Sequence, residues 1–161
     1  MPRSTLIIGY GNTLRGDDGA GPAVVDRLQR RGPRPGPRLR AAHQLTPELA
    51  EELSRHARVV FIDARAAEPP GAIVCEPLQP AADAGGAALT HQFSPAMLLL
   101  LARRLYGRQP AAWLIGINGA DFDPGEGLSP AVARAVDLVA ARWQALIAQT
   151  PKESTPCMKR P

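Results

Sequence analysis

Short apolar runs alternate along this chain with longer segments in which apolar residues recur at helical spacing. The apolar runs predict strands at residues 5–9, 38–42, 58–64, 72–76 and 111–117, and the periodic segments predict helices at residues 21–31, 49–56, 96–106 and 131–147. Because strands and helices alternate, we predict an α/β fold: a single three-layer domain with a central, mainly parallel, five-stranded twisted sheet and helices on both faces. We assign residues 1–149 to this domain and residues 150–161, which lack apolar periodicity, to a flexible C-terminal tail.

Three of the predicted helices share one start signal, a hydroxyl residue followed by proline. The pairs are Thr46-Pro47, Ser94-Pro95 and Ser129-Pro130. A hydroxyl oxygen at the N-cap accepts a hydrogen bond from a backbone N–H of the first turn. Proline suits the first helical position, because a backbone N–H there would have no partner within the helix. The last predicted helix carries a wide apolar face. We therefore expect Trp143, on that face, and Trp113 to be core residues rather than ligand platforms.

Composition and charge narrow the class of protein. The chain has no run of the ~20 apolar residues that a membrane span needs, and its first residues lack the pattern of a signal peptide, so we expect a cytoplasmic protein with no membrane partner. Its two cysteines, Cys75 and Cys157, are too few for a disulfide framework or a cysteine-ligated metal site. Arginines crowd between residues 27 and 40, but no aromatic residue lies among them. We expect a solvated helix end and loop there, not a nucleic-acid surface.

The first predicted strand leads into a glycine-rich segment, GYGNTLRGDDGAG (residues 9–21). Its opening Gly-x-Gly is shared with dinucleotide-binding folds, but Leu14 stands where their third glycine belongs, and two adjacent carboxylates would repel a pyrophosphate. The glycines instead indicate a tight turn with close backbone contacts. We expect one of Asp17 and Asp18 to cap the helix that follows, which leaves the other carboxylate to face the edge of the sheet.

Two further residues are candidates for the same edge. Asp63 ends the third predicted strand, where open α/β sheets place their sites, although a turn or cap hydrogen bond would also explain an acid there. If the first and third strands are neighbours, Asp18 and Asp63 emerge side by side. His91 precedes the third predicted helix, whose start can bring the imidazole over this edge. Two carboxylates and one imidazole would form a three-ligand site for a divalent metal, with vacant positions. His43 either faces this site as well or lies on the surface.

These motifs resemble those of the hydrogenase maturation endopeptidases. That family has an apolar strand, then Gly-x-Gly-Asn-x-Leu, then Asp-Asp or Asp-Glu, and then Gly-x-Gly, and residues 6–21 carry each element at the same spacing. The resemblance places the family's metal-contacting residues on Asp18, Asp63 and His91. It extends to the turn GLSP before the last helix. The chain departs from the family after the second strand, where many members carry Asp-Gly-Gly-Thr and this chain has AAHQ (residues 41–44).

The resemblance implies an endopeptidase, aspartic-type or nickel-dependent, that removes the C-terminal extension from the nickel-loaded precursor of a [NiFe] hydrogenase large subunit. The nickel would arrive with the substrate, and Asp18, Asp63 and His91 would complete its coordination, with other divalent metals able to substitute. Either the nickel would polarise the scissile carbonyl, or Asp17, Asp18 or Asp63 would act as a general base on water. The precursor is the expected partner. We expect the protease to be a monomer that binds no nucleic acid.

Two other functions are compatible with the same residues. A maturation chaperone would use these ligands to check the precursor for nickel without cutting it, and only a protease would shorten the precursor. A metal-dependent hydrolase acting on a small phosphorylated substrate would suit the glycine turn. The arginines that could bind its phosphate, however, lie far in sequence from the carboxylates.

Overall fold

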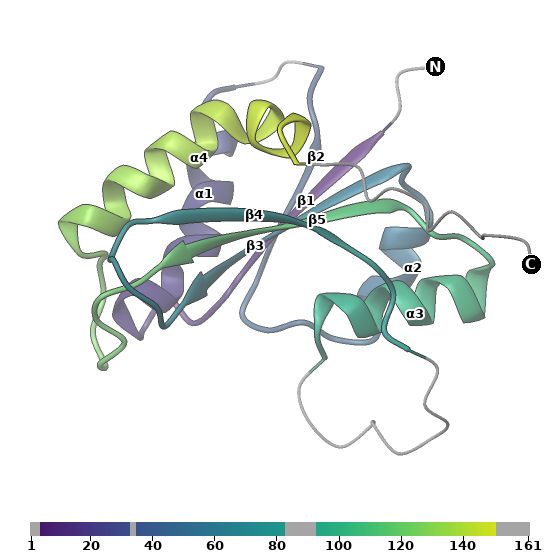
Figure 1. Ribbon diagram of the computed structural model, residues 1–161, viewed down its shortest axis with the longest axis horizontal. Helices are drawn as coiled ribbons and strands as arrows, with labels where there is room; N and C mark the ends of the chain where they lie inside the picture. Colours follow the sequence, from purple (N-terminus) through teal and green to yellow (C-terminus); the bar gives the residue numbers. More distant parts are fainter. Residues whose placement is uncertain (1–3, 33–34, 83–92, 151–161) are drawn as a thin grey trace, which may run out of the picture.

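A five-stranded sheet runs through the middle of the molecule in the order β2-β1-β3-β5-β4 (Figure 1). Its strands are β1 (Thr5–Tyr10), β2 (Arg38–Ala42), β3 (Arg58–Arg65), β4 (Ile73–Leu78) and β5 (Ala111–Asn118). The computed structural model describes residues 4–32, 35–82 and 93–150. Four strands are parallel, and β4 pairs antiparallel with β5 at one edge. The predicted five-stranded, mainly parallel sheet is confirmed.

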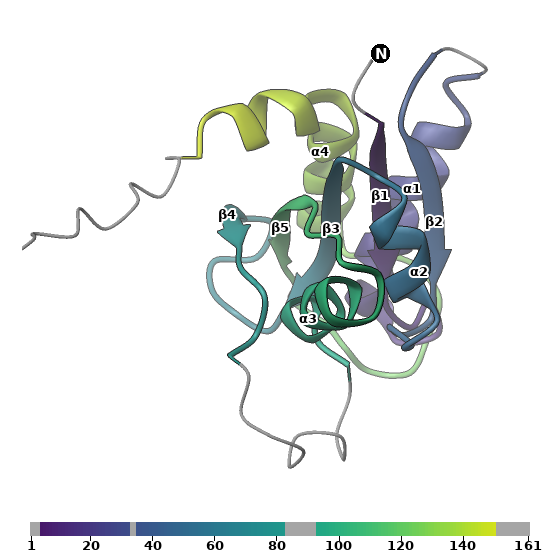
Figure 2. The same cartoon turned by 90° about the vertical axis from the view of Figure 1, so that its right-hand side faces the viewer.

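Helices cover both faces of this sheet, as predicted. They are α1 (Ala20–Gln29), α2 (Leu49–Ser54), α3 (Pro95–Tyr106) and α4 (Pro130–Ala148), and a short 3-10 helix, η1 (Gly16–Gly19), precedes α1. Figure 2 shows α1 and α4 on one face and α2 and α3 on the other. Successive strand residues point to opposite faces, so Ile7 and Val60 pack towards α1 and α4, whereas Leu6 and Phe61 pack towards α2 and α3. Burial on both faces explains why the central strands are almost continuously apolar.

The three predicted helix starts differ in outcome. Ser94 caps α3 as predicted, since its Oγ accepts a hydrogen bond from Met97 N at 3.2 Å. Ser129 is the N-cap of α4, but its hydroxyl makes no cap bond and donates elsewhere. The start at Thr46-Pro47 is wrong. The carbonyls of Thr46 and Pro47 accept hydrogen bonds from the N–H groups of the residues three positions later, Leu49 and Ala50, which closes a tight turn. The helix α2 therefore begins only at Leu49.

Both tryptophans contribute to packing, in agreement with the sequence prediction. Trp143 is buried in the core between α4 and the sheet. Trp113 is half-buried against the same cluster, and its indole N–H donates to the Thr150 hydroxyl at 2.9 Å. Cys75 is half-buried on β4. Cys157 and the predicted tail beyond Thr150 lie outside the described residues.

The described arginine side chains between residues 27 and 40 make contacts within the protein. These exposed side chains pair with carboxylates of α1, α2 and α4 or donate to the backbone: Arg27 to Asp137, Arg30 to Asp26, Arg31 to the Ala140 carbonyl, and Arg38 and Arg40 to Glu52. This agrees with the prediction of a solvated helix end and loop. Within the described ranges, no helix is both long enough and apolar enough to span a membrane.

Candidate functional site

The glycine-rich turn brings η1 onto the carboxyl end of β1. A Cβ atom on Gly9 would lie 2.1 Å from the carbonyl oxygen of Gly21, so only glycine lets α1 approach β1 this closely. Gly11 has φ +145°, and a Cβ there would lie 2.0 Å from the carbonyl oxygen of Asp18. The two glycines therefore fix the position of Asp18 relative to the edge of the sheet.

Asp18 and Asp63 lie in one cleft at this edge, as the sequence predicted for neighbouring strands. β1 pairs with β3 in parallel, and the last pair before the edge is Gly9 with Ile62. The cleft has a volume of about 530 Å³ and is lined by both carboxylates together with residues of β1 and of the segments before α2 and α3. The backbone N–H of Asn12 donates to Asp18 Oδ2 at 2.7 Å, which orients this carboxylate.

The environment of Asp63 makes it a proton acceptor suited to neutral pH. Burial raises the pKa of its carboxyl to about 6, and the negative charge of Asp18 adds to this rise. Hydrogen bonds from the Tyr10 hydroxyl and the Ala64 N–H favour the ionised form and limit the rise. Burial, and after it the charge of Asp63, raises the pKa of Tyr10, so its hydroxyl stays protonated and donates. Near pH 7 the carboxylate of Asp63 is therefore available both to accept a proton and to bind a cation.

Tyr10 is a site residue that the sequence analysis did not identify. It follows Ile8 by two residues on β1, so strand alternation turns it towards the face of α2 and α3. Asp63 follows Phe61 by two residues on β3 and faces the same way. The available signal for the contact between Tyr10 and Asp63 was the alternation of side-chain direction along a strand, which places both residues on the same face of the sheet.

Of the two candidate histidines, only His43 falls in the described part of the chain. It is exposed and also lines the cleft with Asp18 and Asp63, so it fits both alternatives left open for it. His91 lies outside the described residues, so its expected place at this edge stays a prediction; Phe93, two residues later, lines the cleft. Among the described residues, no three His, Cys, Asp or Glu side chains gather closely enough to hold a metal ion.

Asp17 points away from the cleft and has a different environment. Its side chain is fully buried, and it accepts four hydrogen bonds, from Ala120 N, Asp121 N and the N–H and hydroxyl of Ser129. Burial alone would raise the pKa of Asp17, but these hydrogen bonds outweigh it and lower the pKa. Asp17 thereby fastens the loop at residues 119–129 to η1.

Neither aspartate caps α1, so this part of the sequence prediction is wrong. The N-cap of α1 is Gly19, and no side chain makes a cap hydrogen bond there. The side chains of Asp17 and Asp18 instead accept hydrogen bonds from the 119–129 loop and from the turn after β1. The tight turn of η1 directs one carboxylate to each side.

Comparison with known proteins gives a likeness in structure. No protein-family model matches the sequence, and no curated protein is significantly similar to it. The [NiFe] hydrogenase maturation protease HycI from Thermococcus kodakarensis KOD1 is 21% identical with a TM-score of 0.70, covering 91% of this chain and 94% of that one. The hydrogenase maturating endopeptidase HybD from E. coli is 22% identical with a TM-score of 0.69, covering 91% and 93%. A hydrogenase 2 maturation peptidase from a Thaumarchaeota archaeon is 24% identical with a TM-score of 0.65, covering 91% and 99%.

These structures extend over nearly the whole described chain. The protein therefore has the fold of the solved [NiFe] hydrogenase maturation proteases, as the resemblance of its motifs implied.

Proposed function

We propose that this protein is an endopeptidase that removes the C-terminal extension from the nickel-loaded precursor of a [NiFe] hydrogenase large subunit. The observation that carries this proposal is the meeting of Asp18 and Asp63 in one cleft of a chain that has the maturation-protease fold. We place the reaction in the cytoplasm, with the protease acting as a monomer.

Nickel enters this proposal as part of the substrate. Asp18, Asp63 and His91 complete the coordination of the nickel that the precursor carries, because carboxylate oxygens and an imidazole are ligands for divalent transition metals. Other divalent metals of similar size can occupy the same positions. A precursor without nickel loses this coordination energy, so the protease distinguishes loaded from unloaded precursor by a difference in affinity.

Hydrolysis then uses the carboxylates of the cleft. One oxygen of Asp63 accepts a proton from water, the water oxygen attacks the scissile carbonyl carbon, the C–N bond breaks, and the proton passes to the leaving amine. The substrate's nickel polarises the carbonyl oxygen. Asp17 supports the reaction indirectly, since it holds the 119–129 loop against the turn that carries Asp18.

Intact-mass spectrometry of the nickel-loaded precursor tests the proposal. Wild-type protein should shorten the precursor to one discrete product, whereas Asp18→Asn and Asp63→Asn should leave it at full length. Asp123→Asn is the matched control, because Asp123 is exposed and does not line the cleft. If wild type binds the precursor and its mass does not change, the protein is the non-cutting, nickel-checking chaperone instead. If it neither binds nor cuts, a role in hydrogenase maturation is contradicted.

A further inference from the structure

The strand β2 forms an open edge of the sheet beside the cleft. It pairs only with β1 among the described strands, and all five of its residues are exposed or half-exposed. The Ala42 carbonyl accepts a hydrogen bond from Gly11 N at 3.0 Å, so the backbone groups of Ala42 face β1. Alternate residues of a strand turn their N–H and C=O to opposite sides, so Leu39 and Ala41 direct theirs outward. Such an edge is a template for pairing with another extended chain.

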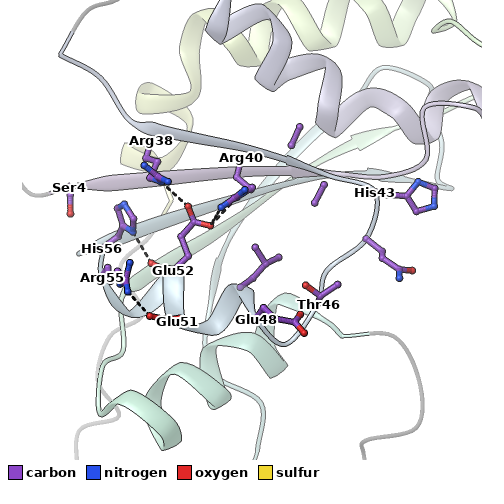
Figure 3. A pocket seen from close by; sticks show the side chains of 14 residues that line it. Ser4, Arg38, Arg40, His43, Thr46, Glu48, Glu51, Glu52, Arg55 and His56 are labelled. Atoms are coloured by element: carbon purple, nitrogen blue, oxygen red, sulfur yellow. Dashed lines mark hydrogen bonds and ion pairs between the residues drawn. The ribbon is translucent and has the colours of Figure 1, made fainter.

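A groove of about 890 Å³ runs along this strand, between β2 and α2 (Figure 3). His43, Gln44 and Thr46 line this groove and also line the cleft that contains Asp18 and Asp63. The groove and the cleft therefore adjoin at these three residues, so a chain that follows β2 along the groove ends beside the cleft of the two carboxylates.

Charge does not select the occupant of this groove. The guanidinium groups of Arg38 and Arg40 bind Glu52 at 2.8 and 2.7 Å, and that of Arg55 binds Glu51 (Figure 3). These pairs neutralise most of the charge that lines the groove. Among the residues that the structure describes, no hydrogen bond is made by the outward backbone groups of Leu39 and Ala41, and main-chain pairing at such groups tolerates many side-chain sequences.

We propose that the C-terminal extension of the precursor binds along the open edge of β2, beside this groove, as an added strand antiparallel to β2. Its backbone forms hydrogen bonds with the outward N–H and C=O groups of Leu39 and Ala41. This inference rests on the proposed function and adds the substrate-binding surface to it.

The direction of the added strand follows from the position of the cleft. β2 runs towards the cleft, because parallel strands β1 and β2 end at the same edge of the sheet. The folded body of the precursor, with its nickel, lies at the cleft, and the extension leads away from the scissile bond along β2. It therefore runs opposite to β2. A strand rises about 3.4 Å per residue, so roughly five residues of extension reach the far end of β2.

Ala41→Pro tests the inference, with Ala41→Val as the matched control. Proline removes the outward N–H of residue 41 but no hydrogen bond to β1, and proline is tolerated at such edge positions. Valine keeps the N–H and favours a strand. With the nickel-loaded precursor as substrate, Ala41→Pro should raise KM about tenfold, which corresponds to about 1.4 kcal/mol, with kcat within twofold of wild type. Because valine keeps this N–H, the KM of Ala41→Val should stay well below that of Ala41→Pro.

Amide hydrogen exchange in the wild-type protein provides a second test that does not depend on the folding of a variant. A synthetic peptide that spans the cleavage site and the extension should slow exchange at Leu39 and Ala41 and leave α4 amides unchanged. Unchanged exchange at both residues, or equal KM values for the proline and valine variants, would overturn the inference while cleavage by wild type still supports the protease. Failure of wild type to cut the precursor would contradict the proposed function itself.

Discussion

Replacing Asp17 by asparagine tests whether this buried carboxylate holds the loop at residues 119–129 against η1. Asp17 Oδ2 accepts hydrogen bonds from Ala120 N at 2.8 Å, Asp121 N at 3.0 Å and the Ser129 hydroxyl at 2.9 Å, and Oδ1 accepts one from Ser129 N at 2.7 Å. Asparagine has nearly the same shape, but one of its two terminal atoms donates rather than accepts. The substitution therefore changes charge and hydrogen bonding while leaving the packing in place.

The expected loss of stability follows from these four bonds. The least disruptive orientation puts the asparagine nitrogen at the position of Oδ1, where only the bond from Ser129 N is lost. A hydrogen bond to a charged group contributes about 1.5–3 kcal/mol and a neutral one about 1 kcal/mol. Losing one charged bond and weakening three gives a loss of at least about 3 kcal/mol. For a domain of this size, that corresponds to a fall in Tm of at least about 6 °C.

Urea unfolding at pH 7, followed by far-UV circular dichroism, measures this loss. Asp123→Asn is the control and should lie within about 0.5 kcal/mol of wild type, because Asp123 is exposed. The pKa of Asp17 is lowered in the folded protein, so its contribution is present above the unfolded pKa of 3.8 and is lost as pH falls through the folded pKa. The gap between wild type and Asp17→Asn should therefore close in acid. Equal stability of the two asparagine variants at pH 7 would refute this role for Asp17.

Further predictions concern the cleft, the glycine turn and the start of α4. In carbon-13 NMR the Asp63 carboxyl should titrate with a midpoint near pH 6, and Tyr10→Phe should raise this midpoint because it removes a hydrogen bond that favours the ionised form. In urea unfolding, Gly9→Ala should cost more than about 3 kcal/mol or prevent folding, since its Cβ would lie 2.1 Å from a backbone oxygen. Gly107→Ala, with no atom within 4 Å of the new Cβ, should cost only the ~1–2 kcal/mol of a left-handed residue. Ser129→Ala removes one of four donors to the buried carboxylate and should cost about 1–2 kcal/mol in the same assay.

A specific result would contradict each of these predictions. A midpoint near pH 4 for Asp63 would show that its carboxyl is not desolvated. Equal losses for the two glycine variants would contradict the close approach of α1 to β1. If Ser129→Ala were as destabilising as Asp17→Asn, the hydroxyl rather than the backbone donors would be the main partner of the carboxylate.

The sheet was predictable because its central strands are buried on both faces and so are marked by continuous apolar runs. The direction of β4 was not assigned from the sequence, although residues 66–72 are too few for a helical crossover and so favour an antiparallel strand. The start of α2 was mispredicted because Thr46-Pro47 satisfies the local rules for a helix start equally well in a tight turn. Local patterns thus predict the elements better than their ends.

The site was predictable to the extent that it depends on neighbouring strands. Asp18 and Asp63 meet because β1 and β3 are adjacent, a relation that alternating strands and helices make probable in advance. The environment of Asp17 depends on Ala120 and Ser129, more than 100 residues away along the chain, and no local pattern carries that information. The place of His43 depends on the path of the segment between β2 and α2, which no periodicity describes.

The proposed function depends most on the cleft of Asp18 and Asp63 as the place where the precursor's nickel is held. Crystals of the protein soaked in a zinc salt, with anomalous diffraction measured at the zinc edge, test this directly. We expect one strong peak about 2.0–2.2 Å from a carboxylate oxygen of each aspartate, with the His91 imidazole as third protein ligand. A peak bound only elsewhere, or none in the cleft of a fully soaked crystal, would contradict it.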